Sequence, residues 1–444
     1  MAHIVPFRGI LYNPNKAKDL SKVIAPPYDV ITPEEQERLY RKSPYNIVRL
    51  ILNQEPDPYA SAARLFEAWQ GEGVLARDNA PALYFLRHRF PLQDEGERDR
   101  LGFIALSRIE DFSTGAIRPH ERTLEAPKED RLRLMLACHA NLDPIFALYS
   151  EPKQLINRAF LEHLRGLPPL REAGDDGGAS CHLWRVSDPG IVRLVSQEMK
   201  NRPLLIAYGH HRFEAAMNYR DRMSREKGNS SGREPFHYAM MYFANMEDEG
   251  LVILPTHRLV RVFQPIPFQK LEEALQRYFY IEPYPKTPDG QRWFLRALKG
   301  AKKRRLIGAS FKRDPRYLIL RLKNKRFMQR LAADVKGPVR ELDVTVLHLL
   351  ILQHTLGIKP EEQANEEVIG YSQDAEKALR AVDKEDYQAA FILNPPEPEE
   401  VMEIAMSGEK MPQKTTYFYP KLPSGLVINR IDPEEEIEGN AGGA

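Results

Sequence analysis

The middle of the chain alternates between short apolar runs and longer runs with helical spacing, and this alternation limits the fold more than any other feature. The runs PIFALYS, CHLWRVS, PLLIAYG and HYAMMYFAN have the length and the apolar content of buried strands. Runs with helical character alternate with them: KEDRLRLMLACHA precedes the first, and PKQLINRAFLEHL, GIVRLVSQEMKN and RFEAAMNYRDRMSREKG stand between them. Strands that alternate with helices in this way predict an α/β protein with helices packed on a mixed sheet.

At 444 residues the chain is longer than one hydrophobic core usually supports, so we expect several packed parts. We predict an N-terminal α/β segment over residues 1–115, a central domain over 116–262 and a C-terminal α/β segment over 263–432. Residues 433–444, PEEEIEGNAGGA, are acidic and then small, which predicts a disordered tail.

Two local signals lie in the N-terminal segment. The sequence predicts that a helix begins near Thr32. Thr32 has the position of the N-cap, Pro33 that of the first helical residue, and Glu35 that of the third, as in a capping box. The apolar runs on either side of QDEGER predict a hairpin.

The composition argues against several classes of protein. No stretch approaches the roughly 18 apolar residues that span a bilayer, and VTVLHLLIL (344–352) predicts a buried helix instead. Pro6 and Arg8 interrupt the N-terminus where a signal peptide needs an apolar run, so we expect a cytoplasmic protein without membrane contacts. The net charge of +2 gives no overall attraction to nucleic acid, and KKRR (302–305) and KNKR (323–326) predict a solvated hairpin surface.

The two cysteines do not predict a disulfide framework or a zinc site. Each precedes a histidine, at Cys138–His139 and Cys181–His182. Adjacent side chains diverge on a helix or a strand, so such a pair does not converge easily on one tetrahedral ion. P-loop, GxSxG and HExxH patterns do not occur in the sequence.

The stretch LLIAYGHHRFEAAMNYR places Gly209, His210, His211 and Arg212 between a predicted strand and a predicted helix. A helix N-terminus has unpaired N–H groups and a partial positive charge, which favour phosphate. Gly209 lets the backbone approach a ligand closely, and Arg212 can bind two oxygens at once. The alternative is a surface turn that only requires a glycine.

A second polar stretch is RPHERTLEAPKEDR, which contains His120, Glu121, Thr123, Lys128 and Arg131. Lys128 and Arg131 are three residues apart at the start of a predicted helix, so they lie on one face. A carboxylate beside cationic groups suits a general base that acts when a phosphoryl group is the electrophile. The alternative is a solvated loop.

Additional candidates lie further along the chain. His257 and Arg258 occur in LPTHRLV, where a structural role is the alternative. Lys414 occurs in MPQKTTYFYPK, from which it can reach a ligand as part of a loop.

Six stretches together resemble a known family: APPYDVI, RPHERTLEAPKEDRL, NLDPIFALY, IAYGHHRFEAAMNYR, LPTHRLV and MPQKTTYFYPK. In this order they resemble domain-of-unknown-function family 1015 (DUF1015) over nearly the whole chain. The central domain also resembles the ParB-like fold of chromosome-partitioning clamps, sulfiredoxin and free serine kinases, in which a Gly-x-x-Arg turn holds nucleotide phosphates. Gly209 and Arg212 match that turn, and Glu121 in PHERT matches the kinases' general base.

This resemblance implies a nucleotide-dependent phosphotransferase that acts on a small hydroxylated metabolite, such as a hydroxy amino acid, with Mg²⁺ and ATP or ADP. The implied catalytic residues are Glu121, His120 and His210. The implied phosphate-binding residues are Gly209, His211, Arg212, Lys128, Arg131 and Thr123, with Lys414, His257 and Arg258 as additions.

One departure from the family pattern favours an alternative. Related sequences typically read Asp-Gly-His-His-Arg, whereas this chain has Tyr208 before Gly209. Loss of the aspartate favours a non-catalytic nucleotide-binding regulatory or interaction protein. A third hypothesis, nucleic-acid binding by analogy with partitioning proteins, is disfavoured by the near-neutral charge and by the lack of a convincing helix-turn-helix.

Overall fold

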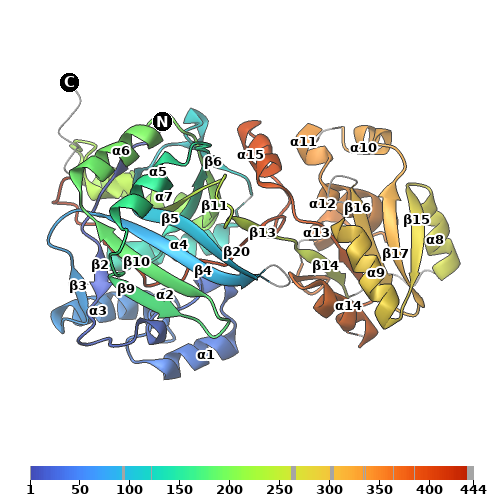
Figure 1. The fold of residues 1–444 in the computed structure, drawn as a ribbon, viewed down its shortest axis with the longest axis horizontal. Helices are drawn as coiled ribbons and strands as arrows, with labels where there is room; N and C mark the ends of the chain where they lie inside the picture. Colours follow the sequence, from blue (N-terminus) through green and yellow to red (C-terminus); the bar gives the residue numbers. More distant parts are fainter. Residues whose placement is uncertain are drawn as a thin grey trace. The chain divides into compact units, whose positions relative to one another are not determined.

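The structure is a computed structural model that describes residues 2–92, 96–121, 123–261, 267–300, 305–333, 335, 337–363, 365–384 and 386–437 (Figure 1). The chain forms two compact units. Residues 1–252 and 420–444 make up the first unit, and residues 253–419 make up the second. The chain therefore leaves the first unit once and returns to it near its C-terminus.

The first unit is built on a nine-stranded mixed sheet in the order β6-β11-β8-β12-β5-β4-β10-β9, with β1 paired to β5. The strands are β1 (Ile4–Val5), β4 (Leu83–Leu92), β5 (Gly96–Arg108), β6 (Ile117–Pro119), β8 (Ile145–Tyr149), β9 (Arg171–Gly174), β10 (Ser180–Val186), β11 (Leu204–Tyr208) and β12 (Tyr238–Asn245). β6 is parallel to β11 and β8 is parallel to β12, while the other neighbours are antiparallel. The predicted α/β class with a mixed sheet is confirmed.

Four helices pack against this sheet in one hydrophobic core: α4 (Glu125–Cys138), α5 (Leu155–His163), α6 (Pro189–Met199) and α7 (His210–Lys227). Phe213 and Tyr219 of α7, for example, share this core with Phe243 of β12. Every residue of β12 is buried. Such continuous burial is expected of a strand that is covered on both faces.

The smaller elements of the first unit come mainly from its N-terminal part. They are α1 (Pro33–Lys42), α2 (Val48–Ile51), α3 (Pro58–Gly71), β2 (Ile10–Tyr12) paired with β3 (Leu75–Arg77), and β7 (Ala140–Asn141) paired with β21 (Asn429–Arg430). Thr32 accepts a hydrogen bond from the Glu35 N–H at 3.3 Å, so the predicted helix start is confirmed. β4 and β5 form the predicted hairpin, although residues 93–95 lie outside the described residues.

The division into two units differs from the predicted domain limits. β5 pairs with β12, so residues on both sides of the predicted boundary near 115 share one sheet. Residues 420–437, which we expected in a C-terminal segment, belong to the first unit, where β21 pairs with β7. These pairings join segments that are distant in sequence, and local patterns do not reveal them.

The predicted disordered tail is described only in part. Glu435 forms an ion pair with Arg77 at 2.5 Å, and the Ile437 N–H donates to Arg233 O at 2.8 Å. Residues 438–444 lie outside the described residues.

The second unit contains a six-stranded antiparallel sheet in the order β15-β17-β16-β19-β14-β18. The strands are β14 (His257–Val260), β15 (Phe279–Pro285), β16 (Leu306–Phe311), β17 (Arg316–Leu322), β18 (Ile369–Ser372) and β19 (Ala389–Ile392). Helices α9 (Pro288–Lys299) and α14 (Ala375–Asp383) share a core with this sheet. The apolar run at 344–352 forms α12 (Asp343–Val346) and a π-helix (Leu347–Gln353) with mostly buried residues, as the predicted buried helix required.

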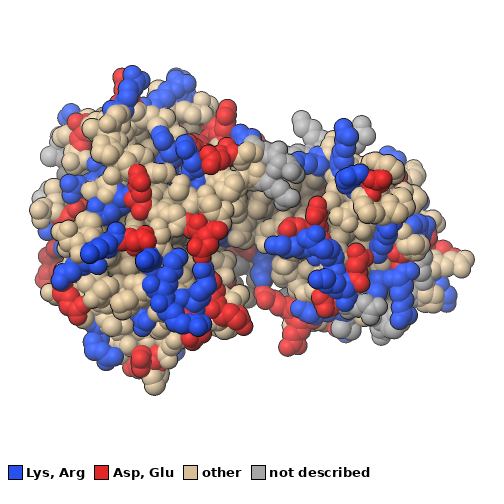
Figure 2. Space-filling model, turned by 60° about the horizontal axis from the view of Figure 1, so that its bottom comes forward, with Lys and Arg blue, Asp and Glu red and all other residues tan. Residues whose placement is uncertain are grey.

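The surface carries charges of both signs. On the face that Figure 2 shows, basic and acidic side chains are interspersed, as expected for a net charge of +2. Residues 323–326 are exposed, and Lys325 pairs with Glu341 at 2.7 Å, while residues 302–304 lie outside the described residues. Among the helices described, none has both the length and the apolar character needed to cross a bilayer.

Candidate active site

The parallel pairing of β6 with β11 brings together the two polar stretches that the sequence singled out. Because both strands end at the same edge of the sheet, the residues after Pro119 meet those after Tyr208. The rings of His120 and His210 lie edge to face, with their centroids 4.7 Å apart. Two stretches about ninety positions apart in sequence therefore form one site.

Ring nitrogens of both histidines take part in hydrogen bonds at this edge of the sheet. His120 donates from Nδ1 to Ile206 O at 2.7 Å, and its backbone N–H donates to His210 Nε2 at 3.4 Å. Burial lowers the pKa of His120 to about 4, with a further contribution from Lys421. His210 Nε2 therefore acts as the acceptor in this contact.

The turn between β11 and α7 is formed by Gly209, which has a φ of 95°. A β-carbon at this position would lie 3.1 to 3.2 Å from the Arg212 guanidinium, which folds back over the glycine. Gly209 is also the N-cap of α7 and has no side chain to cap it. The first N–H groups of this 18-residue helix therefore remain without an intrahelical partner beside a guanidinium group.

Arg212 is held in place but retains donor capacity. Its Nη1 donates to Pro144 O at 2.6 Å. Its Nε is buried and has no hydrogen-bond partner among the described residues. The guanidinium also lies over the Tyr208 ring, 5.0 Å from the centroid.

A lysine from the C-terminal part of the first unit completes the cationic group. The ammonium of Lys421 lies 3.5 Å from the centroid of the Tyr208 ring. Burial lowers the pKa of Lys421 to about 8, and the nearby Arg212 lowers it further, while Asp29 and Glu121 oppose the shift. Lys421 therefore interacts electrostatically with the Arg212 guanidinium and with the carboxylates of Asp29 and Glu121.

Tyr208, the residue before Gly209, connects the turn to a further carboxylate. Its hydroxyl donates to the carboxylate of Asp29, from the APPYDVI stretch. Asp29 is itself exposed. A carboxylate therefore still lies beside the turn, although it comes from a different part of the chain.

Other predicted residues form the adjoining wall around Glu214. Thr123 donates to Glu214 at 2.8 Å, and Lys128 lies 3.8 Å from the same carboxylate and 2.7 Å from Glu125. The Leu124 N–H donates to His211 Nε2 at 3.0 Å. These contacts fix the loop after β6 against the first turn of α7.

Arg131 lies on the other side of Arg212. The two arginines line a small cavity of about 40 Å³ together with Asp143. Arg131 also stacks on Tyr28 at 4.0 Å and donates to Ile51 O at 3.1 Å. Arg131 and Arg212 therefore line the same small cavity beside the turn that the sequence singled out.

Three predicted additions belong to the other unit. His257 accepts the Leu393 N–H at 3.2 Å, Arg258 donates to Thr256 O, and Lys414 pairs with Glu366. All three lie among residues 253–419, which form the second unit, whereas the turn belongs to the first.

A comparison with protein families gives the chain's relationship. The model described as "Protein of unknown function (DUF1015)" matches residues 4–345, which is most of the sequence. The chain belongs to the DUF1015 family. The family that the six stretches indicated is thereby confirmed.

Solved structures show only distant likenesses to the DUF1015 chain. A conserved hypothetical protein from Pyrococcus furiosus is 16% identical, covering 70% of this chain and 90% of its own, with a TM-score of 0.31. A free serine kinase mutant in complex with ADP is 13% identical, covering 68% and 83%, with a TM-score of 0.33. SbnI with a C-terminal truncation, from Staphylococcus aureus, is 10% identical, covering 75% and 91%, with a TM-score of 0.35. TM-scores this low carry no structural argument.

No protein with a curated description is significantly similar to the chain. The assignment of activity therefore rests on the residues of the first unit.

The implied Mg²⁺ can be tested against the donors at the turn. Within the described residues, no group of three or more His, Cys, Asp or Glu side chains is placed to hold a metal ion. Mg²⁺ is often bound by one or two carboxylates together with substrate phosphates and water. Asp29 and Glu121, which both act on Lys421, fit that pattern.

Sequence reasoning missed two residues of this site, Asp29 and Lys421. Both lie in stretches that carried the family resemblance, APPYDVI and MPQKTTYFYPK. In the second stretch, Lys414 was chosen because it sits in a polar loop, whereas Lys421 ends the stretch next to Pro420. Lys421 belongs to the first unit and Lys414 to the second, a difference that loop polarity does not reveal.

Proposed function

We propose that this DUF1015 chain is a nucleotide-dependent phosphotransferase whose phosphate site is the turn between β11 and α7. The observation that carries the proposal is the Arg212 guanidinium folded over Gly209 at the uncapped N-terminus of α7. Backbone N–H groups, the helix dipole and a guanidinium then address the same space, which suits a phosphate group. Lys421 adds a second positive charge to this space.

Arg212 and Lys421 would have different roles at the phosphates. The planar guanidinium of Arg212 binds two oxygens, and its buried Nε is the donor available for one of them. The compact ammonium of Lys421 would neutralise charge that develops on the transferred group. Arg131, across the small cavity from Arg212, would bind an outer phosphate oxygen.

Glu121 is our candidate general base. It follows His120, which is buried and positions the loop through its bonds to Ile206 O and His210. The Glu121 carboxylate would accept the proton of the substrate hydroxyl while that oxygen attacks phosphorus and the nucleotide leaves. Lys128, Thr123 and His211 form the neighbouring wall, where a small hydroxylated metabolite would contact them.

Mg²⁺ would be held by Asp29 together with phosphate oxygens and water, which leaves Glu121 to act as the base. When bound, it would offset the negative charge of the nucleotide. Asp29 already acts on Lys421 at this turn, which supports this assignment.

One observation favours the alternative, a nucleotide-binding regulatory or interaction protein without catalysis. Tyr208 occupies the position of the usual aspartate, and its hydroxyl engages Asp29. If that contact removes Asp29 from metal binding, the nucleotide would bind but would not react.

Turnover separates the two functions. The full chain is incubated with ATP or ADP, Mg²⁺ and hydroxy amino acids such as serine, and the release of ADP or AMP is measured. The kinase account predicts product, and Glu121→Gln lowers kcat by about 10² to 10⁴ while nucleotide affinity is retained. Glu129→Gln, an exposed position on α4 paired with Arg133, is the control and leaves turnover unchanged. Nucleotide binding without product favours the regulatory protein, and full turnover in Glu121→Gln excludes Glu121 as the base.

A further inference from the structure

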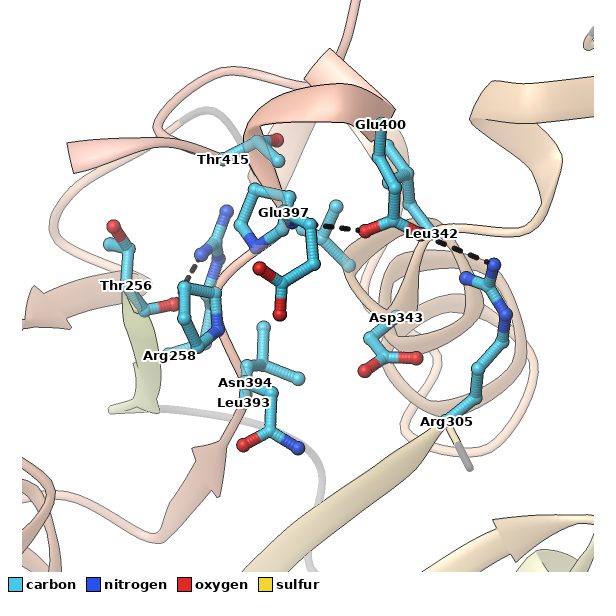
Figure 3. Close-up of a pocket in the computed structure, with 13 residues that line it drawn as sticks. Thr256, Arg258, Arg305, Leu342, Asp343, Leu393, Asn394, Glu397, Glu400 and Thr415 are labelled. Carbon is cyan, nitrogen blue, oxygen red and sulfur yellow. Dashed lines mark hydrogen bonds and ion pairs between the residues drawn. The ribbon is translucent and has the colours of Figure 1, made fainter. Parts of the chain in front are cut away.

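The second unit contains a cavity of about 270 Å³ that is unrelated to the turn in the first unit (Figure 3). Its wall is formed by residues at the start of β14, by the start of α12 and by the segment that joins β19 to α15 (Pro398–Met406). Its volume is close to the lower end for small-molecule sites, about 300 Å³. The polar groups on its wall define what kind of molecule it suits.

The two arginines of the cavity are engaged with the wall itself. Arg258 donates from Nη1 to Thr256 O and from Nη2 to Gln413 O, the second at 3.2 Å. Arg305 pairs through Nη2 with Glu400 at 3.5 Å, as Figure 3 shows. These guanidinium groups each hold a backbone or side-chain group of the wall.

The N-terminus of α15 does not present free donors to the cavity either. Glu397 and Glu400 form a capping box, in which the Glu397 N–H donates to Glu400 Oε2 at 3.1 Å and the Glu400 N–H is bound by Glu397. A capping box uses up N–H groups that an anion would otherwise bind. The carboxylates also offset the positive end of the helix dipole.

The other polar groups of the cavity wall are mainly hydrogen-bond acceptors. The carboxyl groups of Asp343 and Glu397 both point into the cavity in Figure 3. Asp343 receives no hydrogen bond from any described residue, and burial raises its pKa to about 7. Asn394 donates to Leu298 O at 3.2 Å and Thr415 donates to Pro412 O at 2.5 Å, which leaves their oxygens as acceptors.

We propose that this cavity binds a small organic compound with a primary ammonium group, whose N–H donors bond to Asp343 and Glu397. A primary ammonium has three donors and no acceptor, which complements a wall of oxygen acceptors. Arg305 acts on Asp343 electrostatically, but no described residue donates a hydrogen bond to its carboxylate, and an ammonium group would supply that bond. Three carboxylates and two guanidinium groups line the cavity, so one added cation balances them.

The test uses n-butylammonium as the probe and n-pentanol as its neutral counterpart. Binding to the full chain is measured by ligand-observed NMR at about pH 8, where the amine is protonated and the carboxylates are ionised. The proposal predicts that n-butylammonium binds and n-pentanol does not. Asp343→Asn, which keeps the shape but removes the charge, lowers the affinity by about tenfold or more.

Glu399→Gln is the matched control, since this exposed residue of α15 removes the same charge away from the cavity. It leaves the affinity unchanged. The melting temperature of each variant without probe shows whether the fold is intact, and the comparison of the two probes on the unaltered chain needs no variant. Equal binding of the two probes, unchanged affinity in Asp343→Asn, or phosphate binding at the cavity would each overturn the proposal.

Discussion

Arg212 folds back over Gly209, and its Nε lies 3.1 Å from the position that a β-carbon on the glycine would take, which is closer than an ordinary van der Waals contact. The two residues therefore affect each other. A side chain at Gly209 would press against the guanidinium, and the φ of 95° would strain any other residue at this position.

Gly209→Ala tests this dependence. The substitution forces a side chain into the left-handed region and against the guanidinium, so the free energy of unfolding should fall by about 1–3 kcal/mol. Nucleotide affinity should fall as well, because Arg212 is displaced. Urea unfolding and equilibrium nucleotide binding measure the two effects.

Gly228→Ala is the control for backbone strain alone. Gly228 ends the same helix at a φ of 72°, but a β-carbon there meets nothing within 4 Å. Gly228→Ala should lose stability and retain nucleotide affinity. If both variants lost affinity equally, the contact between Gly209 and Arg212 would have no role in binding.

Lys421 predicts two pH dependences of opposite sign. Its folded pKa of about 8 lies below the unfolded value of 10.5, so the folded state binds fewer protons between these pH values. Its contribution to the free energy of unfolding therefore rises with pH across that window. Nucleotide affinity should instead fall as pH rises through about 8, because phosphate favours the charged lysine.

Two variants separate these effects of Lys421. Lys421→Met should lose the rise in stability and most of the pH dependence of binding, whereas Lys421→Arg should keep affinity without that pH dependence. Urea unfolding and nucleotide titrations over a pH series provide the data. An unchanged binding profile in Lys421→Met would remove the lysine from the site.

Tyr208 has two separable contacts. Tyr208→Phe removes the hydroxyl bond to Asp29 and should lower the free energy of unfolding by about 1 kcal/mol, with nucleotide affinity nearly unchanged. Tyr208→Ala also removes the ring beneath Lys421 and should lower affinity by about tenfold. Calorimetric titration distinguishes the two, and a large loss of affinity in Tyr208→Phe would show that the hydroxyl, and not the ring, supports the site.

The sequence predicted those features that depend on a few neighbouring residues. The Thr32 cap and the turn from Gly209 to Arg212 are set within four positions, and propensity and spacing suffice for them. The meeting of His120 with His210 depends on the parallel pairing of two strands, which neither residue spacing nor propensity indicates.

Sequence reasoning missed the features that depend on the chain's return to the first unit after residue 419. Lys421 reaches the turn because the chain comes back to the first unit after residue 419, and no local pattern encodes that return. For the same reason Lys414, only seven positions earlier, was chosen as a candidate although it belongs to the second unit. Polar composition indicates a loop equally well in either unit, so it does not tell to which unit a polar loop belongs.

The central claim is that nucleotide phosphates bind at the Gly209 turn, and thermal unfolding with ATP, ADP, CTP and GTP in the presence of Mg²⁺ tests it most directly. A ligand at about 100 times its Kd stabilises the folded state by about 2.7 kcal/mol, which raises the melting temperature measurably. The account predicts such a rise in the unaltered chain, its loss in Arg212→Ala, and its retention in Arg222→Ala, an exposed arginine of the same helix paired with Glu226. No rise with any nucleotide, or an equal rise in Arg212→Ala, would contradict it.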